Sequence, residues 1–257
     1  MKISIVGSGN LASHIIPRLV EKGIKIHQLF SRNHSTGKSL SKKHTLSFIE
    51  EISLFDLNVD VVLLCVSDSS IKELVPHFKN YKGILVHTSG TAPINDLNKH
   101  KGNNGVLYPL QTFSPKVKVN WNEIPVFVEG NNEATEKKLL QLAKKLSKKT
   151  YQLNSKQRKE LHLGAVFVNN FVNACYDIAY THLQNKNLKW EYLLPLIHQT
   201  TLKIEHNAPK DVQTGPARRN DQKIINEHLQ LLKKEKNAME VYRVMTEYIK
   251  SNYQVQD

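Results

Sequence analysis

Short apolar runs alternate with amphipathic segments along the first half of the chain. The pattern predicts strands over residues 2–6, 24–30, 59–66, 83–87, 125–128 and 150–153, and helices over residues 10–22 and 133–147. The run over residues 59–66 is almost entirely apolar, which is typical of a strand buried on both faces of a parallel sheet. Strands that alternate with helices predict an α/β domain with a Rossmann-type parallel sheet.

The pattern changes after Asn154, where long helical stretches replace the short strands. Ser155 is the predicted N-cap of a helix that runs to about residue 184. Further helices are predicted over residues 190–206, 222–233 and 238–252, and a loop with two prolines and a glycine over residues 208–220. We therefore predict a Rossmann domain over residues 1–154 and an all-α domain over residues 155–257 that binds substrate and mediates dimerisation.

Composition narrows the class of protein. Of the 257 residues, 40% are hydrophobic and 23% are charged, which is the balance of a globular protein. No apolar run approaches the roughly 20 residues that span a bilayer, and the first residues lack the pattern of a signal peptide. We therefore expect a cytoplasmic protein with no role at a membrane.

The net charge of +13 raises the question of a nucleic-acid partner. The lysines are spread over predicted helix surfaces without interleaved aromatic residues, so we expect no nucleic-acid binding. A positive field would instead attract a phosphorylated cofactor or an acidic substrate. Cys65 and Cys175 fit small core residues without a disulfide, and no Cys and His set has the spacing of metal ligands.

A glycine-rich turn follows the first predicted strand and opens the first predicted helix. It has the pattern G-x-G-x-x-A, formed by Gly7, Ser8, Gly9, Asn10, Leu11 and Ala12. The first glycine permits the tight turn, the second lets the backbone approach a pyrophosphate, and the alanine allows close packing of helix on strand. Free N–H groups at the helix start then hold the anion, so the turn predicts a dinucleotide site.

The end of the second strand selects the cofactor. NAD enzymes usually place a carboxylate there for the ribose 2′-hydroxyl, whereas this strand ends in Phe30, Ser31, Arg32 and Asn33. Arg32 can pair with a 2′-phosphate and Ser31 can donate to it. We therefore predict NADP, with NAD as the alternative in which these residues form only a polar loop.

Two further strand ends border the expected ligand crevice. Val66, Ser67 and Asp68 follow one buried strand, and His87, Ser89 and Gly90 lie at the end of the next. Ligands in open α/β sheets bind beyond the carboxyl ends of strands, so we expect all six residues near the cofactor. Asp68 has the alternative role of a helix N-cap. His87 is either a titrating group or a histidine satisfied at a strand end.

Six motifs occur in the order of a known family. They are residues 7–12, Val66-Ser67-Asp68, His87-Thr88-Ser89-Gly90, Tyr108-Pro109-Leu110-Gln111-Thr112-Phe113, His162 through Asn170-Phe171, and residues 214–221. Over nearly its whole length the chain resembles the bacterial oxidoreductase family in which a Rossmann-like domain precedes a helical domain of unknown function. It is more distantly similar to pyrroline-5-carboxylate reductase, the β-hydroxyacid and 6-phosphogluconate dehydrogenases, and the deazaflavin-dependent NADP reductases. The resemblance implies an NADP-type cofactor in the domain cleft and a homodimer formed through the helical domain.

The chain departs from these relatives at two places. The β-hydroxyacid dehydrogenases carry a catalytic lysine four residues before an asparagine; if that asparagine is Asn170, the lysine position holds Val166. This argues against alcohol oxidation of their kind. The nearest family usually has glycine where this chain has Asn220, a residue that also tolerates left-handed backbone.

Polar residues interrupt the first long helix. At 100° per residue, His162, Val166, Asn169 and Asn173 share one stripe, with Asn170 at its margin. Buried polar groups need partners, so the stripe is either a substrate pocket with His162 as proton donor or a polar dimer contact. Helical geometry favours Asn169 as the partner of His162 and the resemblance favours Asn170, so both stay candidate catalytic residues.

The predicted activity is NADPH-dependent reduction of a small C=O or C=N substrate. We expect Ser89, Gln111 and Arg219 to contact this substrate, with Arg219 paired to an acidic group. A salt bridge to a neighbouring helix is the alternative for Arg218 and Arg219. A non-catalytic NADP(H)-binding sensor or scaffold is the alternative function. Apolar residues spread around the first long helix predict a homodimer.

Overall fold

The computed structural model describes residues 1–115 and 117–253. The chain divides into two compact units, Met1–Asn170 and Phe171–Asp257. The domain boundary predicted after residue 154 coincides with the start of helix α5 (Ser155–Ala165), which belongs to the first compact unit.

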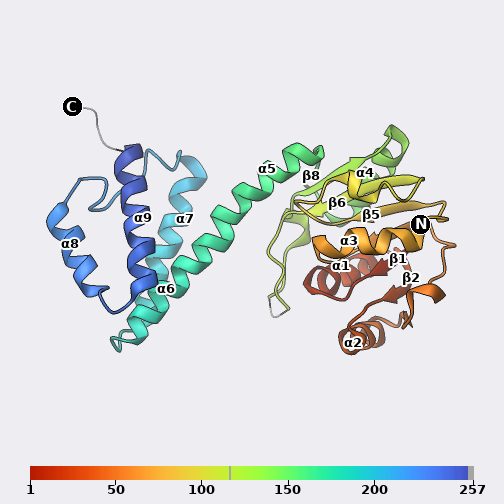
Figure 1. The fold of residues 1–257 in the computed structure, drawn as a ribbon, viewed down its shortest axis with the longest axis horizontal. Helices are drawn as coiled ribbons and strands as arrows, with labels where there is room; N and C mark the ends of the chain where they lie inside the picture. Colours follow the sequence, from red (N-terminus) through yellow and green to blue (C-terminus); the bar gives the residue numbers. More distant parts are fainter. Residues whose placement is uncertain (116, 254–257) are drawn as a thin grey trace. The chain divides into compact units, whose positions relative to one another are not determined.

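An eight-stranded sheet forms the centre of the N-terminal unit, in the order β3-β2-β1-β4-β5-β6-β7-β8 (Figure 1). The strands are β1 (Lys2–Val6), β2 (Lys25–Phe30), β3 (Ser47–Ile49), β4 (Val61–Leu64), β5 (Ile84–His87), β6 (Asn103–Pro109), β7 (Val126–Gly130) and β8 (Thr150–Gln152). All neighbouring strands are parallel except β6 and β7, which are antiparallel. The predicted α/β class with a Rossmann-type sheet is confirmed, and this sheet has one antiparallel pair, β6 with β7.

Helices cover both faces of this sheet. Apolar residues of α1 (Asn10–Glu21), α2 (His34–His44) and α4 (Glu133–Leu146) form one buried cluster with the strands. Residues of α3 (Asp68–Leu74) and the 3-10 turn η2 (Val75–Phe78) form the cluster on the other face. Shorter 3-10 turns are η1 (Ile52–Leu54), η3 (Ile94–Leu97) and η4 (Trp121–Glu123). Strand order reverses beside β1, and ligands of open α/β sheets bind at such a point.

Among the strands and α-helices of this unit, three are absent from the sequence prediction: β3, β6 and α2. The strand β6 begins with Asn103, Asn104 and Gly105, which are turn formers, and it ends in a proline. The helix α2 has one large apolar residue, Leu40, and contains Gly37, so its helical period is weak. The strand β3 has only three residues. Each of these elements is formed through contacts with the sheet rather than through a strong local pattern.

The second unit is entirely helical, as predicted. Its elements are α6 (Val172–Gln184), the 3-10 turn η6 (Trp190–Leu193), α7 (Leu194–His206), α8 (Gln222–Leu231) and α9 (Lys236–Tyr253) (Figure 1). A π-helical turn, Val166–Phe171, joins α5 to α6. Among the described residues of this unit, only Ala217, Ile225 and Thr246 are buried. Cys175 is exposed, so its interpretation as a core residue is wrong, whereas Cys65 is buried.

Local backbone features test two sequence predictions. The N-cap of α5 is Asn154 and not Ser155, because the Asn154 side chain accepts from the Gln157 N–H while the Gln157 side chain accepts from the Asn154 N–H. This reciprocal pair is a capping box. Asn220 has a φ of +52°, which confirms the left-handed backbone expected there. No helix in the described ranges has the length and apolar character to cross a membrane.

Candidate functional site

The turn between β1 and α1 leaves room for an anion. Gly7 has a φ of +107°, and a Cβ there would lie 2.1 Å from the Cys65 carbonyl oxygen. Gly9 is the N-cap of α1, and a Cβ at Gly9 would meet nothing within 4 Å. No side chain caps α1, whereas Asn or Asp side chains cap α2, α4, α5 and α8. The first N–H groups of α1 therefore face open space with the positive end of the helix dipole.

A cavity of about 660 Å³ begins at this turn and follows the carboxyl ends of β1, β2, β4 and β5. The predicted cofactor residues that line it are Gly7, Ser8, Gly9, Asn10, Leu11, Ser31, Arg32, Val66, Ser67, Asp68 and Ser89. Ala12 is buried where α1 packs on the sheet, as its role in close packing requires. His87 and Gly90 are not among the lining residues. The glycine turn, the hydroxyl groups and the guanidinium that line this cavity are groups that can hold a dinucleotide.

Hydroxyl groups and one guanidinium gather at the end of β2. The Ser8 hydroxyl lies 2.7 Å from the Ser31 hydroxyl and 2.6 Å from the Thr36 hydroxyl, at the start of α2. Arg32 donates to the Ser70 hydroxyl and, at 3.3 Å, to the Glu73 carboxylate. Both sides of this Arg32–Glu73 pair are about two-thirds exposed, so the pair is weak and a phosphate can compete for the guanidinium. Thr36 was not predicted as a site residue, because its hydroxyl lies near that of Ser8 only in the folded protein.

Asp68 does not act as an N-cap. The N-cap of α3 is Ser67, and Asp68 is the first residue of the helix. The Asp68 carboxylate accepts a hydrogen bond from the Thr91 hydroxyl and also faces the cavity. Asp68 therefore connects the start of α3 with the turn that follows β5.

His87 lies beneath this turn and away from solvent. Its Nδ1 accepts a hydrogen bond from the Ser89 N–H at 3.2 Å, and the ring is fully buried. Burial, with a smaller contribution from the charge of Arg158, lowers the pKa of His87 to about 3. The ring is therefore neutral near pH 7 and supports the backbone of Ser89, which argues against a titrating group. It is not a fully satisfied histidine either, because its buried Nε2 has no hydrogen-bond partner among the described residues.

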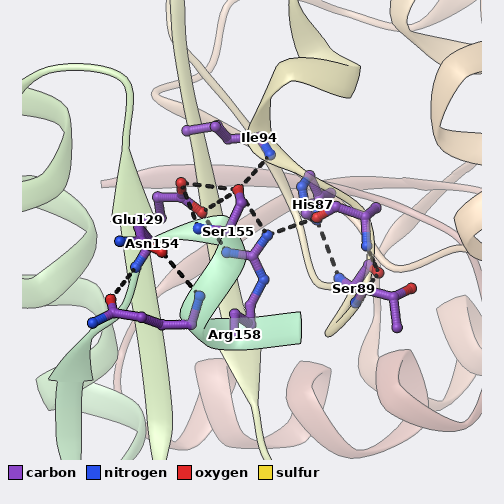
Figure 2. Close-up of polar contacts among 10 residues, drawn as sticks. His87, Ser89, Ile94, Glu129, Asn154, Ser155 and Arg158 are labelled. Atoms are coloured by element: carbon purple, nitrogen blue, oxygen red, sulfur yellow. Dashed lines mark hydrogen bonds and ion pairs between the residues drawn. The ribbon is translucent and has the colours of Figure 1, made fainter. Parts of the chain in front are cut away.

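A buried ion pair fixes the start of α5 against the same turn (Figure 2). The Arg158 side chain is 1% exposed and donates to the Glu129 carboxylate on β7 and to the Ala92 carbonyl oxygen at 2.6 Å. Ser155 donates to both Glu129 oxygens and accepts from the Ile94 N–H. Arg158 and Glu129 therefore join α5, β7 and the turn after β5 into one rigid group.

His162 follows Arg158 by four residues and so lies on the same face of α5. Its Nδ1 lies 2.9 Å from the hydroxyl of Tyr108 on β6. A Cβ at Gly90 would lie 2.5 Å from this Nδ1 and 2.9 Å from the Tyr108 Cζ, so only glycine permits this approach. The structure thus brings the predicted catalytic residue His162 close to Gly90, which was predicted to lie near the cofactor. Tyr108 contacts both residues. The sequence prediction included Tyr108 in a motif without assigning it a role.

A second cavity of about 630 Å³ is lined by Tyr108, His162 and the predicted residues Gln111, Asn169 and Asn170. Arg219 is exposed in the helical unit, and its neighbour Arg218 donates to the Tyr253 carbonyl oxygen at 3.4 Å. The structure therefore brings the predicted catalytic residues His162, Asn169 and Asn170 to one cavity of the first unit.

A π-helical turn interrupts the predicted stripe of His162, Val166 and Asn169. Regular α-helical geometry was the basis for that stripe, whereas a π-helical turn closes with an i→i+5 bond and contains about one residue more. Asn169 and Asn170 both lie within this turn, and both line the second cavity. Both therefore stay candidate residues.

Two family models match the chain. One, described as NADP oxidoreductase coenzyme F420-dependent, matches residues 2–88, and the other, Domain of unknown function (DUF2520), matches residues 124–249. The structure is similar to that of a candidate NADP oxidoreductase from Bacteroides fragilis, with 33% sequence identity, a TM-score of 0.93 and 98% of each chain covered. A comparison with curated proteins finds no match.

More distant solved structures share the fold. An imine reductase from Myxococcus stipitatus in complex with NADP+ has 12% identity and a TM-score of 0.68, covering 98% of this chain and 96% of that chain. A 1-pyrroline-5-carboxylate reductase from Streptococcus pyogenes has 16% identity and a TM-score of 0.64, covering 98% of each chain. The resemblance stated from the sequence motifs is confirmed.

Proposed function

Because the chain belongs to the NADP oxidoreductase family that joins a Rossmann-like domain to DUF2520, we propose that it uses NADPH to reduce a small C=O or C=N substrate beside His162. One observation carries the proposal: the turn after β5 lines one cavity and contacts a residue that lines the other. Ser89 lines the dinucleotide cavity, and the adjacent Gly90 contacts His162, which lines the second cavity. A substrate in the second cavity would therefore lie beside the cofactor cavity.

The residues present fit the cofactor along its length. The uncapped start of α1 and the open space at Gly9 suit a pyrophosphate. The hydroxyls of Ser8, Ser31 and Thr36, with Arg32, suit a 2′-phosphate. When bound, NADPH supplies the hydride, and the protein must orient the substrate and supply a proton.

His162 is the proposed proton donor. Imidazole is the side chain that exchanges a proton near neutral pH, and hydrogen-bond reach to the substrate is the first requirement of an acid. Gln111 and Asn170 line the same cavity and can hold the substrate by amide hydrogen bonds. The acidic substrate group expected from Arg219 is not part of this proposal.

The test combines cofactor titration with a substrate screen followed at the nicotinamide absorbance. NADPH should bind, and His162→Ala should lower turnover about a hundredfold while NADPH affinity stays nearly constant. A matched control is His77→Ala, which removes an exposed imidazole on η2 and should change neither value. Full turnover by His162→Ala would refute the role of His162, and failure to bind NADPH would refute the proposed function.

One observation favours the sensor alternative. Val166 occupies the position where the β-hydroxyacid dehydrogenases have their catalytic lysine, so that chemistry is missing here. Binding of NADPH without turnover of any carbonyl or imine in the screen would support a sensor. Turnover that depends on His162 would support the enzyme.

The helical unit supports a homodimer. On α9, Val241, Val244, Met245 and Tyr248 are all exposed and have the i, i+3, i+4, i+7 spacing of one apolar stripe. On α7, Leu196, Leu202 and Ile204 are exposed as well. An exposed apolar stripe such as that of α9 often marks an interface, and a second copy of this chain is the proposed partner.

A further inference from the structure

We propose that Tyr108 is a positioning residue that confines the neutral form of the His162 imidazole to a single tautomer, with the proton on Nε2. The inference concerns the state of one ring in the free protein. Its effect on turnover rests on the proposed function, whereas the state of the ring does not.

The argument begins with the hydroxyl of Tyr108. The side chain is 8% exposed, and burial raises the pKa of Tyr108 to about 12, so the hydroxyl keeps its proton at neutral pH. A buried hydroxyl needs an acceptor for that proton. Among the described residues the hydroxyl has His162 Nδ1 as its hydrogen-bond partner, at 2.9 Å. The phenol therefore donates, and Nδ1 accepts.

The direction of this bond fixes the histidine. A neutral imidazole carries its proton on one nitrogen and a lone pair on the other. Because Nδ1 supplies the lone pair to Tyr108, the proton lies on Nε2. The hydrogen bond also sets the rotation of the ring, which lies at 62° to the tyrosine ring with centroids 6.0 Å apart.

The residues around the His162 and Tyr108 rings leave little room for either ring to move. Gly90 lies so close that even a methyl group there would overlap both rings. The turn that holds Gly90 is tied to α5 by the bond from Arg158 to the Ala92 carbonyl, one helical turn before His162. His162, Tyr108 and Gly90 therefore come from three elements whose relative positions are fixed by buried bonds.

The same hydrogen bond prepares His162 for proton transfer by fixing the orientation of its ring. To act as the acid, the ring must first be protonated on both nitrogens; its Nδ1–H then donates to the Tyr108 oxygen and its Nε2 proton passes to the substrate, which leaves a neutral ring with the proton on Nδ1. Without the hydroxyl, both tautomers become available and the ring can rotate. Misplacement of an acid by about 1 Å, or loss of a supporting hydrogen bond, typically lowers turnover about tenfold to a hundredfold. Tyr108→Phe should therefore lower kcat by that factor and leave the affinity for NADPH unchanged.

The decisive measurement is the nitrogen spectrum of the imidazole. The full chain is labelled with ¹⁵N-histidine, and two-bond ¹H–¹⁵N correlations are recorded above the pH at which the ring protonates, with His162→Gln used to assign the signal. The wild type should show the Nε2–H tautomer alone, and Tyr108→Phe should show both tautomers. Tyr151→Phe is the matched control, because it removes a hydroxyl from a half-exposed tyrosine on β8 and should leave the His162 signal unchanged.

Each outcome decides the inference. A wild-type ring with the proton on Nδ1, or with a mixture of tautomers, overturns it even if Tyr108→Phe does not fold. An unchanged single tautomer in a folded Tyr108→Phe variant overturns it as well, since another group must then hold the ring. The predicted spectra in a protein that fails to bind NADPH would uphold this inference and refute the proposed function.

Discussion

At the end of β2, Arg32 is the cationic residue that separates the two nicotinamide cofactors in the proposed site. A charge-assisted bond to the 2′-phosphate is worth about 1.5–3 kcal/mol, which corresponds to a preference for NADPH over NADH of about tenfold or more. Arg32→Ala should remove most of this preference, as measured by fluorescence titration of both cofactors. Arg243→Ala, which removes an exposed arginine on α9, is the control for a loss of net charge. Equal affinities in the unaltered protein would refute the NADP preference.

His87 gives the protein a defined sensitivity to acid. Its pKa is depressed to about 3 in the folded protein by burial, whereas histidine in an unfolded chain titrates near 6.5. Between these values only the unfolded chain binds the proton, so the stability that neutral His87 contributes is present above about pH 6.5 and falls as the pH falls towards 3. The expected loss is roughly 1 kcal/mol of unfolding free energy per pH unit.

Urea unfolding between pH 7 and 4 checks this prediction. The unfolding free energy of His87→Gln should fall less steeply with decreasing pH than that of the wild type. The control His77→Gln replaces an exposed ring and should keep the wild-type slope. If His87→Gln also kept the wild-type slope, the buried ring would have to accept a proton without penalty.

Residues with local roles could be predicted from the sequence, and residues with tertiary roles could not. Gly7 and Gly9 act through their own backbone, so their spacing alone indicated the phosphate-binding turn. Thr36 and Tyr108 gain their roles from Ser8 and His162, which are distant in sequence. Arg158 is a charged residue on a helix, so its local sequence indicates an exposed side chain. Nothing local indicates that it is buried and forms an ion pair with Glu129.

At the scale of elements, one buried ion pair determines where α5 begins on the sheet. Glu129→Gln would leave the Arg158 guanidinium buried without its carboxylate, which typically costs about 3–5 kcal/mol. Urea denaturation should show this loss. The double variant Glu129→Leu with Arg158→Met should recover a large part of it, because no unpaired charge remains.

The exposed pair of Glu123 and Lys149 provides the control for this prediction. Glu123→Gln removes a carboxylate from an ion pair in water and should leave the unfolding free energy nearly unchanged. A loss in Glu129→Gln no larger than that in Glu123→Gln would show that the Arg158 site is open to water.

The long helix shows that the sequence can predict a helix without predicting which of its side chains share a face. Apolar periodicity correctly indicated a helix from the region of Ser155 to Gln184. The pattern does not reveal the π-helical turn over Val166–Phe171, because one inserted residue preserves helical character and changes only which side chains share a face. The choice between Asn169 and Asn170 was therefore open from the sequence.

At the scale of the whole molecule, the order of strands and helices indicated the architecture but not its details. Alternation predicts a sheet with crossover helices, and the observed sheet has these. The period of a strand does not encode its direction, so the antiparallel pairing of β6 with β7 could not be foreseen. Periodicity also does not show whether α5 belongs to the compact unit of the sheet or to the helical unit. Buried contacts, such as that of Arg158 with the Ala92 carbonyl, determine this assignment.

The helical unit cannot bury its apolar residues by itself. Exposed fractions reach 66% at Val244 on α9 and 62% at Leu196 on α7, and only three described residues of this unit are buried. Placing such surface in water is unfavourable by about 25 cal/mol for each Å². A partner that covers both helices would therefore contribute substantially to the stability of this unit.

The last prediction concerns that partner. Sedimentation at micromolar concentration should give the mass of two chains, and Val244→Glu should shift the population towards one chain because it places a charge within the apolar stripe of α9. Leu54→Glu is the matched control: Leu54 is 69% exposed on η1 in the other unit, so the same substitution there should leave the dimer intact. A single-chain mass for the unaltered protein would contradict the dimer. Equal weakening by both substitutions would contradict the stripe of α9 as its interface.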